Sequence, residues 1–154
     1  MSRLPEISRE SFEDAKQVAF DALVEDNGGS VPMGPGLVAA HSPVMALSRR
    51  ALSHYVRYEI PLPQSVQELA ILVTARRGDC PYVWNAHAPE ARKQGVNESL
   101  VSAIRDGGLL PPMNPEEAAV VNLTNELLET HQLSDSTFSA ASDAFGLAGV
   151  IDVI

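Results

Sequence analysis

The chain has 154 residues, of which 45% are hydrophobic and 20% are charged, so it is long enough and apolar enough to bury a sizeable core. This composition excludes an intrinsically disordered chain, which would carry fewer apolar residues. Acidic residues outnumber basic ones by 20 to 11, and the longest basic runs are the pairs Arg49-Arg50 and Arg76-Arg77, so no nucleic acid is expected as a partner.

No stretch resembles a secretory leader or a membrane span. Residues 1–10 carry charges and a proline in place of an apolar run. The longest apolar run, residues 69–73, is far shorter than the roughly 20 residues that cross a bilayer. The single cysteine, Cys80, excludes an intrachain disulfide and fits a reducing compartment. We therefore expect a cytoplasmic protein with no membrane partner.

Helical spacing of apolar residues dominates the first 60 residues. It predicts a first helix between residues 8 and 28. Residues 31–36 are rich in Pro and Gly and are predicted to form a loop, with one short turn over residues 37–41. A second helix is predicted over residues 42–59, because a Ser-Pro pair at its start supplies a cap and a first-turn proline.

Two helices joined by a tight turn are predicted next. The pattern Ser65-x-x-Glu68 is a capping box that begins the third helix, and the apolar run that follows predicts that this helix is buried. Cys80 and Pro81 are typical of a cap residue and a first helical residue, so they begin the fourth helix. Pro89 is expected to kink that helix.

Three more helices are predicted over residues 97–106, 114–131 and 134–145, each after an Asn or Ser cap. The sequence shows no alternating strand pattern, no internal repeat and no linker that would separate two domains. We expect one all-α domain over residues 1–154, with about six to seven helices and a central helical hairpin. Residues 147–154 are an apolar segment whose exposed face indicates either self-association or a truncated final helix.

Three side chains of the predicted hairpin can carry chemistry. Glu68 shares a helix face with apolar residues three, four and seven positions further on. Cys80 and His87 lie seven residues apart, two turns along one face of the fourth helix. A sulfur at a helix N-terminus favours the thiolate form. A histidine can act as acid or base near neutral pH, and Glu68 is the carboxylate expected to orient His87.

Each of these residues, taken singly, also has a purely structural explanation. Cys80 fits a small core residue, and Glu68 fits the third position of a capping box. His87 fits a core histidine whose ring nitrogens are hydrogen-bonded, or an exposed histidine. Tyr82 and Trp84 fit core or interface aromatics. Only the joint spacing favours a functional site.

The spacing of Glu68, Cys80 and His87 resembles the signature of the carboxymuconolactone decarboxylase and alkyl hydroperoxidase D-like superfamily. The pattern Cys-x-Tyr-x-Trp-x-x-His-x-Pro and the His-Ser-Pro tripeptide at residues 41–43 are also similar to that family. The resemblance covers about residues 30–130. It implies the all-α alkyl hydroperoxidase D-like fold, a homo-oligomer that is a trimer or hexamer, and catalysis without a cofactor.

The decarboxylase branch implies loss of carbon dioxide from a small organic acid or lactone, or related lyase or isomerase chemistry, in the breakdown of aromatic compounds. His87 would then transfer a proton, Glu68 would orient it, and Cys80 would line the pocket. The side chains expected to bind the small-molecule substrate are Tyr82, Val83 and Trp84. Arg76 and Arg77 are candidates for holding the carboxylate of the substrate.

Two alternatives stay open. The hydroperoxidase branch carries a Cys-x-x-Cys pair, and its second cysteine falls at Val83 here, so peroxide chemistry at Cys80 requires an external resolving thiol. The chain is also consistent with a non-catalytic oligomeric binding module. No metal site is expected, because the four histidines show no paired ligand spacing.

Overall fold

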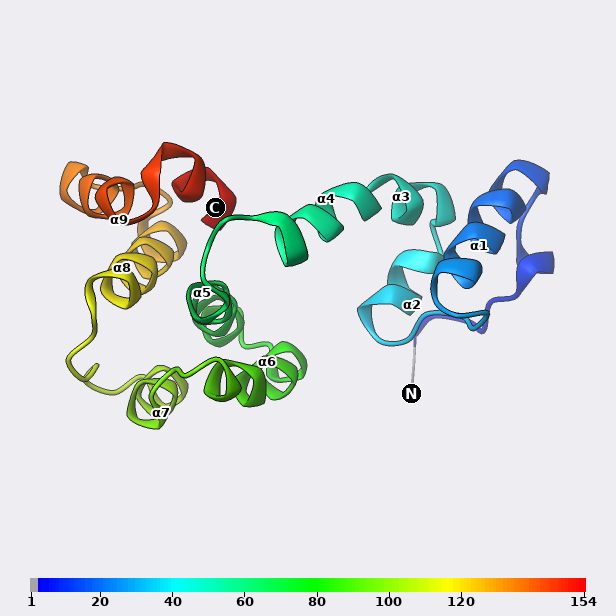
Figure 1. Ribbon diagram of the computed structural model, residues 1–154. Coiled ribbons are helices and arrows are strands. Elements are labelled where there is room, and N and C mark those ends of the chain that lie inside the picture. The colour runs from blue at the N-terminus through cyan, green and yellow to red at the C-terminus, as the bar shows by residue number, and fades with distance from the viewer. Residues whose placement is uncertain (1–2) are drawn as a thin grey trace. The chain divides into compact units, whose positions relative to one another are not determined.

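The computed structural model describes residues 3–154, and this part of the chain is helical without any strand (Figure 1). It contains nine α-helices, one short 3-10 helix and one π-helical segment. Contacts group the chain into two compact units, one ending at Glu59 and the other spanning Ile60–Ile154. One domain over residues 1–154 stays a prediction. No helix of the described residues is long and apolar enough to cross a membrane.

The first unit is built from short helices with a small core. Its elements are a 3-10 turn at Arg9–Ser11, α1 (Asp14–Asp26), α2 (Pro35–Ala40), α3 (Pro43–Ser48), α4 (Arg50–His54) and the π-helical segment η2 (Tyr55–Glu59). Helices α1 and α2 both pack on α3. The buried side chains are mostly small, with Phe20 as the one large ring among those of α1 to α3.

The second predicted helix, residues 42–59, is divided in the structure into α3, α4 and η2. None of residues 48–59 is buried, so no core contact holds this stretch in one regular α-helical geometry. The predicted turn over residues 37–41 is instead the helix α2, which begins at Pro35. These two differences account for the helix count being higher than six to seven.

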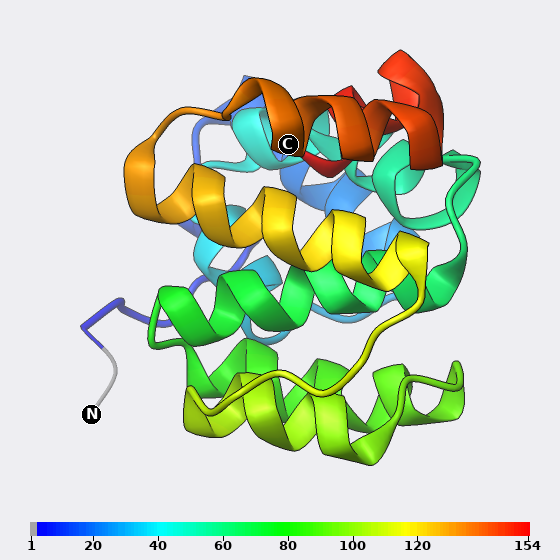
Figure 2. The ribbon, with the colours of Figure 1, turned by 90° about the vertical axis from the view of Figure 1, so that its left-hand side faces the viewer.

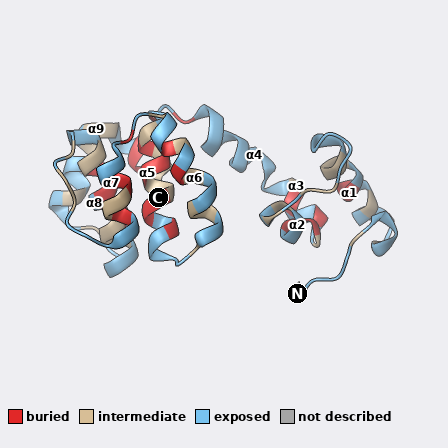
Figure 3. Ribbon diagram, turned by 90° about the horizontal axis from the view of Figure 1, so that it is seen from below, coloured by how far each residue is buried: buried red, intermediate tan, exposed pale blue. Residues whose placement is uncertain are grey.

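The second unit is a helical array around α5 (Figure 2). Its elements are α5 (Gln64–Arg77), α6 (Pro81–Lys93), α7 (Glu98–Asp106), α8 (Pro115–Thr130) and α9 (Asp135–Val153). Helix α5 packs against α6, α7 and α8, and α8 packs against α9. As predicted, α5 is largely buried: Leu69 and Leu72 are completely inaccessible, and Figure 3 shows buried residues concentrated along this helix. The central α5–α6 hairpin is confirmed.

Most helix starts in this unit were predicted correctly from their caps. The side chain of Asn97 accepts a hydrogen bond from the backbone of Ser99 at the start of α7, and Ser134 caps α9. The capping box predicted at Ser65 is wrong, because α5 begins at Gln64, and its N-cap is Pro63, which makes no side-chain cap hydrogen bond. Glu68 is therefore not a capping residue.

A tight turn joins α5 to α6. Asp79 adopts a left-handed conformation with φ of 46°, its N–H donates to the carbonyl of Arg76 at 3.3 Å, and the N–H of Cys80 donates to the carbonyl of Ala75 at 2.8 Å. These two bonds form a Schellman motif that ends α5. Cys80 is also the N-cap of α6, with Pro81 as its first residue, as predicted. One short motif thus ends one helix and begins the next.

Helix α9 extends past its predicted end at Phe145. Gly146 has φ of 69° and ψ of 169°, values that glycine adopts without strain, and the chain resumes a helix after it. Leu147, Ile151 and Ile154 in this last part are all more than 60% exposed. The exposed apolar face predicted for residues 147–154 is therefore present.

We predict that Asn114→Ala lowers the free energy of unfolding by about 1 kcal/mol. Asn114 accepts from the backbone N–H of Glu117 at 2.9 Å, and the Glu117 carboxylate accepts from the N–H of Asn114 at 3.0 Å, so the change removes half of a complete capping box. Urea titration followed by circular dichroism measures the loss. Ser139→Ala, at an exposed position within α9, should stay within about 0.5 kcal/mol of the parent chain.

Candidate functional site

Glu68 and His87 meet between α5 and α6. The imidazole Nδ1 of His87 lies 2.9 Å from the carboxylate Oε2 of Glu68. The Glu68 side chain is only 8% exposed, and the His87 side chain is 19% exposed. A carboxylate removed from water this far needs a hydrogen-bond donor, and His87 supplies it. The structure therefore joins the two residues that the sequence paired.

This bond gives the two nitrogens of the ring different roles. When the ring is neutral, the carboxylate of Glu68 favours the proton on Nδ1, since Nδ1–H then donates to an ionised acceptor. The lone pair of Nε2 is then available, and no hydrogen bond to Nε2 occurs among residues 3–154. When the ring is protonated, the same carboxylate stabilises the imidazolium. The pair has the arrangement of a general base held by an orienting carboxylate.

Cys80 lies at the N-terminal end of the same helix and is half-buried. Within the described part of the chain, no hydrogen bond links its thiol to His87 or Glu68. The dipole of α6 and the free N–H groups of its first turn surround the N-cap position with positive potential. Two of the three residues predicted to be catalytic are thus in direct contact, and the third shares their hairpin without bonding to them.

Helix α6 has a half-buried stripe along one side. Cys80, Val83, Trp84 and His87 all have intermediate exposure, while Ala88 faces the core. Trp84 packs against the main hydrophobic cluster of this unit. The seven-residue spacing predicts that Cys80 and His87 share this face, and Val83 and Trp84 lie between them along the edge between core and solvent.

Tyr82 lies off this stripe. It is 60% exposed, because it occupies the side of α6 away from the core. Val83 and Trp84 share the stripe with His87, so the three residues predicted to bind substrate do not all lie on one face. Their role in binding stays a prediction.

The two arginines considered as carboxylate anchors are engaged elsewhere. Arg76 donates from Nε to the carbonyl of Arg105 at 2.7 Å. Arg77 donates to Asn125 and to Glu129, both at 2.9 Å. Eight and nine residues separate them from Glu68, which is about 12 Å or more along the helix axis. They connect α5 to its neighbours α7 and α8 at the end distant from the Glu68–His87 pair.

The sequence analysis missed Glu90, which lies one turn after His87 on α6. Gln94 donates to it at 2.6 Å and Lys93 at 3.3 Å, and these two hydrogen bonds are the largest causes that lower the pKa of the Glu90 carboxyl. The charge of His87 acts in the same direction with a smaller effect. The i, i+3 spacing is the signal that would have identified it. A second ionised carboxylate thus stands near the imidazole.

Two surface hollows of the described chain lie away from this pair. One, of about 530 Å³, lies between α8 and α9, and the other, of about 450 Å³, lies in the first unit. Neither is lined by Glu68, Cys80 or His87. No cluster of three or more His, Cys, Asp or Glu side chains among residues 3–154 is arranged to hold a metal ion.

Residues 43–126 match the family model described as the carboxymuconolactone decarboxylase family. The matched range is more than half of the chain and contains Glu68, Cys80 and His87. No curated protein matches the chain significantly, and no solved structure does.

We predict that Glu68→Ala redistributes the proton of the neutral His87 ring. In the parent chain the Nδ1–H tautomer should dominate, and in the variant the Nε2–H form that free imidazole prefers should become the major one. Nitrogen-15 NMR of the imidazole nitrogens at high pH measures both populations. Glu68→Gln, which keeps an oxygen acceptor, should retain the parent tautomer.

The matched control is Glu59→Ala. Glu59 makes a bond of the same type and length, 2.9 Å, to Nδ1 of His54, but both side chains are more than half exposed. This variant should leave the His87 signals unchanged. Unaltered His87 shifts in Glu68→Ala would contradict the arrangement described above.

Proposed function

The chain belongs to the carboxymuconolactone decarboxylase family, and from this premise we propose that it is an enzyme that transfers a proton at a carbon atom of a small organic acid or lactone. The observation that carries the proposal is the 2.9 Å bond between His87 Nδ1 and Glu68 Oε2, which leaves Nε2 as the working nitrogen. Cofactor-independent decarboxylation, or a related lyase or isomerase reaction, is the chemistry that such a pair supports best. A cytoplasmic location is part of the proposal.

In decarboxylation, the bond between the substrate carbon and its carboxylate breaks, and the electron pair moves into an adjacent carbonyl to form an enolate. Carbon dioxide leaves, and the imidazolium of His87 donates its Nε2 proton to the carbon. Water then returns a proton to the ring. The Glu68 carboxylate stabilises the imidazolium form and fixes the ring plane throughout.

The remaining residues have supporting roles in this proposal. Cys80 contacts the substrate without taking part in bond cleavage. Val83 and Trp84 form the apolar wall beside His87, and Tyr82 contributes a hydroxyl from a more exposed position. An isomerase reaction needs the same parts, since His87 would remove a proton from one carbon and return it to another.

We predict that His87→Ala abolishes carbon dioxide release from small organic acids and lactones, with a loss of about a hundredfold or more in kcat. Glu68→Ala should lower kcat by about tenfold or more, because the ring loses its orientation. Cys80→Ser should retain activity. His54→Ala, which removes an exposed histidine of the first unit, is the matched control and should behave like the parent chain. Equal turnover by His87→Ala would refute the proposed role.

A second candidate function is peroxide reduction at Cys80. The observation that favours it is the position of the thiol at the N-cap of α6, beside the first turn of that helix. The thiolate would attack a hydroperoxide, the O–O bond would break, and an alcohol would leave as the sulfur becomes a sulfenic acid. An external thiol would condense with the sulfenic acid and release water, and a second external thiol would reduce the mixed disulfide.

We predict, for this candidate, hydroperoxide consumption that requires added thiol and is lost in Cys80→Ser. Consumption that continues in Cys80→Ser eliminates it. The two functions are distinguishable because the first depends on His87 and survives Cys80→Ser, while the second depends on Cys80. Absence of turnover with organic acids, lactones and hydroperoxides would favour the non-catalytic binding module over both enzymes.

A further inference from the structure

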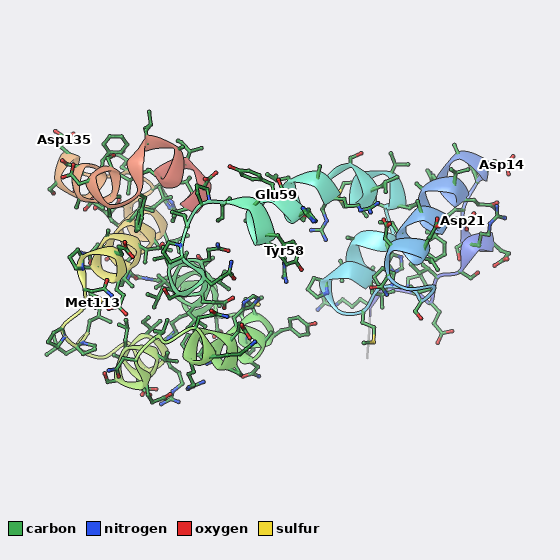
Figure 4. The ribbon with its side chains drawn as sticks, viewed as in Figure 1. Asp14, Asp21, Tyr58, Glu59, Met113 and Asp135 are labelled. Atoms are coloured by element: carbon green, nitrogen blue, oxygen red, sulfur yellow. The ribbon has the colours of Figure 1, made fainter. Side chains whose placement is uncertain are left out.

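The first unit holds a hollow of about 450 Å³ that the proposed reaction does not use. Its walls come from three segments, which are residues 4–7, residues 31–33, and helix α2 with the residue that follows it, His41. All three segments belong to the unit that ends at Glu59, so the walls require nothing from Ile60–Ile154. Figure 4 shows the side chains of this unit, in which Asp14 and Asp21 mark α1.

A close backbone contact holds two of these walls together. A Cβ atom at Gly36 of α2 would lie 2.9 Å from the Cβ of Pro32, which is closer than side chains normally approach. Glycine therefore lets the loop at residues 31–33 lie directly against the helix. The N–H of Gly36 also donates to the carbonyl of Met33 at 3.1 Å. Contacts inside the first unit thus set the shape of the hollow.

His41 lines this hollow, and one nitrogen of its ring has no partner. Nε2 of His41 is buried and forms no hydrogen bond with residues 3–59. A buried polar atom without a partner costs free energy, and native proteins rarely keep one unless a water or a ligand binds it. His41 also begins the His-Ser-Pro tripeptide, to which the proposed reaction gives no role. Nε2 is therefore a candidate anchor for a molecule in the hollow.

The rest of the lining indicates what kind of molecule this is. Among the described residues of the wall, only His41 and Glu6 have polar side chains. No lysine or arginine lines the hollow, and the chain has a net charge of −9, so an anion would gain no partner and would be repelled by Glu6. A cation would lose water against apolar walls, and one exposed carboxylate compensates for little of that loss. An uncharged, largely apolar molecule fits best.

A hydroxyl is the polar group that matches Nε2. In a neutral imidazole, each nitrogen either donates or accepts, depending on which one carries the proton. A hydroxyl can do both, whereas an ether or ketone oxygen can only accept. A hydroxyl therefore pairs with Nε2 of His41 in either tautomer.

We propose that the hollow of the first unit binds a neutral, largely apolar alcohol or phenol, whose hydroxyl bonds to Nε2 of His41. The apolar part of the molecule lies against the walls formed by Val31, Leu37 and Val38. The volume of the hollow falls within the range of about 300–1,000 Å³ that is usual for small-molecule sites. Neither Glu68 nor His87 lines this hollow, and the proposal does not depend on the proposed function.

The test titrates the full chain at pH 7 with 4-ethylphenol, which is uncharged at that pH, and follows binding by nitrogen-15 NMR. The backbone signals of residues 4–7 and 31–41 should shift, and so should the imidazole Nε2 signal of His41. The chain should bind 4-ethylphenol roughly fivefold more tightly than ethylbenzene, which lacks the hydroxyl. The anion 4-ethylbenzoate should bind more weakly than 4-ethylphenol. These measurements need no variant.

Two variants separate the hydroxyl contact from the apolar one. His41→Phe keeps an aromatic ring but removes Nε2, so it should bind the two ethyl compounds equally well. It should also unfold at the temperature of the parent chain or above it, because Nε2 makes no hydrogen bond to residues 3–59 that the change could remove. Val38→Trp, at a position that is 60% exposed, should weaken both compounds by roughly tenfold or more, because the indole occupies the hollow.

The matched controls lie in the same unit but outside the hollow. His54→Phe makes the same change at an exposed histidine, and Val18→Trp makes the same change at a valine of α1 that is 68% exposed. Both controls should bind 4-ethylphenol and ethylbenzene like the parent chain.

Three results would overturn the proposal. Signals of residues 4–7 and 31–41 that do not respond to 4-ethylphenol, or binding that Val38→Trp leaves intact, show that the hollow is not the site. Equal affinity of the parent chain for 4-ethylphenol and ethylbenzene shows that no hydroxyl bond forms. A preference for 4-ethylphenol that persists in His41→Phe shows that the hydroxyl bonds to a group other than Nε2.

Discussion

The hydrogen bond between Glu68 and His87 is the constraint on which the rest of the site depends. Glu68 is only 6% exposed, and burying a carboxylate costs free energy unless a hydrogen-bond donor compensates for the lost water. Here His87 on the neighbouring helix is that donor. The bond therefore acts in two ways. It satisfies a polar group at the edge of the core, and it fixes the orientation and tautomer of an imidazole whose other nitrogen has no hydrogen bond to any of residues 3–154.

The turn between α5 and α6 makes this bond possible. The Schellman motif at Asp79 reverses the chain within a few residues, so that positions 68 and 87 come to face each other across the hairpin. Apolar packing then fixes the distance, since Leu69 and Leu72 on one side and Ala88 and Ala91 on the other belong to the same hydrophobic cluster. A polar pair thus sits beside a close-packed core that leaves the two helices little freedom to separate.

The arginines of the chain are of two kinds, those bonded to a neighbouring helix and those exposed to solvent. Near the hairpin, Arg76 and Arg77 are engaged with α7 and α8, so they stabilise packing between helices. Arg49 and Arg57 are exposed and form no ion pair with a carboxylate of residues 3–154. Arginines of the first kind join helices of one unit, and arginines of the second kind are exposed to solvent. Composition alone does not distinguish the two kinds.

The sequence by itself determined the all-α class, the family, the caps at Asn97, Asn114 and Ser134, and the grouping of Glu68 with His87, because helix caps and side-chain spacing are local properties of the chain. Tertiary structure alone decided that Glu68 bonds to His87 in place of capping α5, that Arg76 and Arg77 are occupied, and that residues 42–59 break into three helical pieces. These outcomes depend on which partner lies across from a residue and on which faces are buried, and residues distant in the sequence set both.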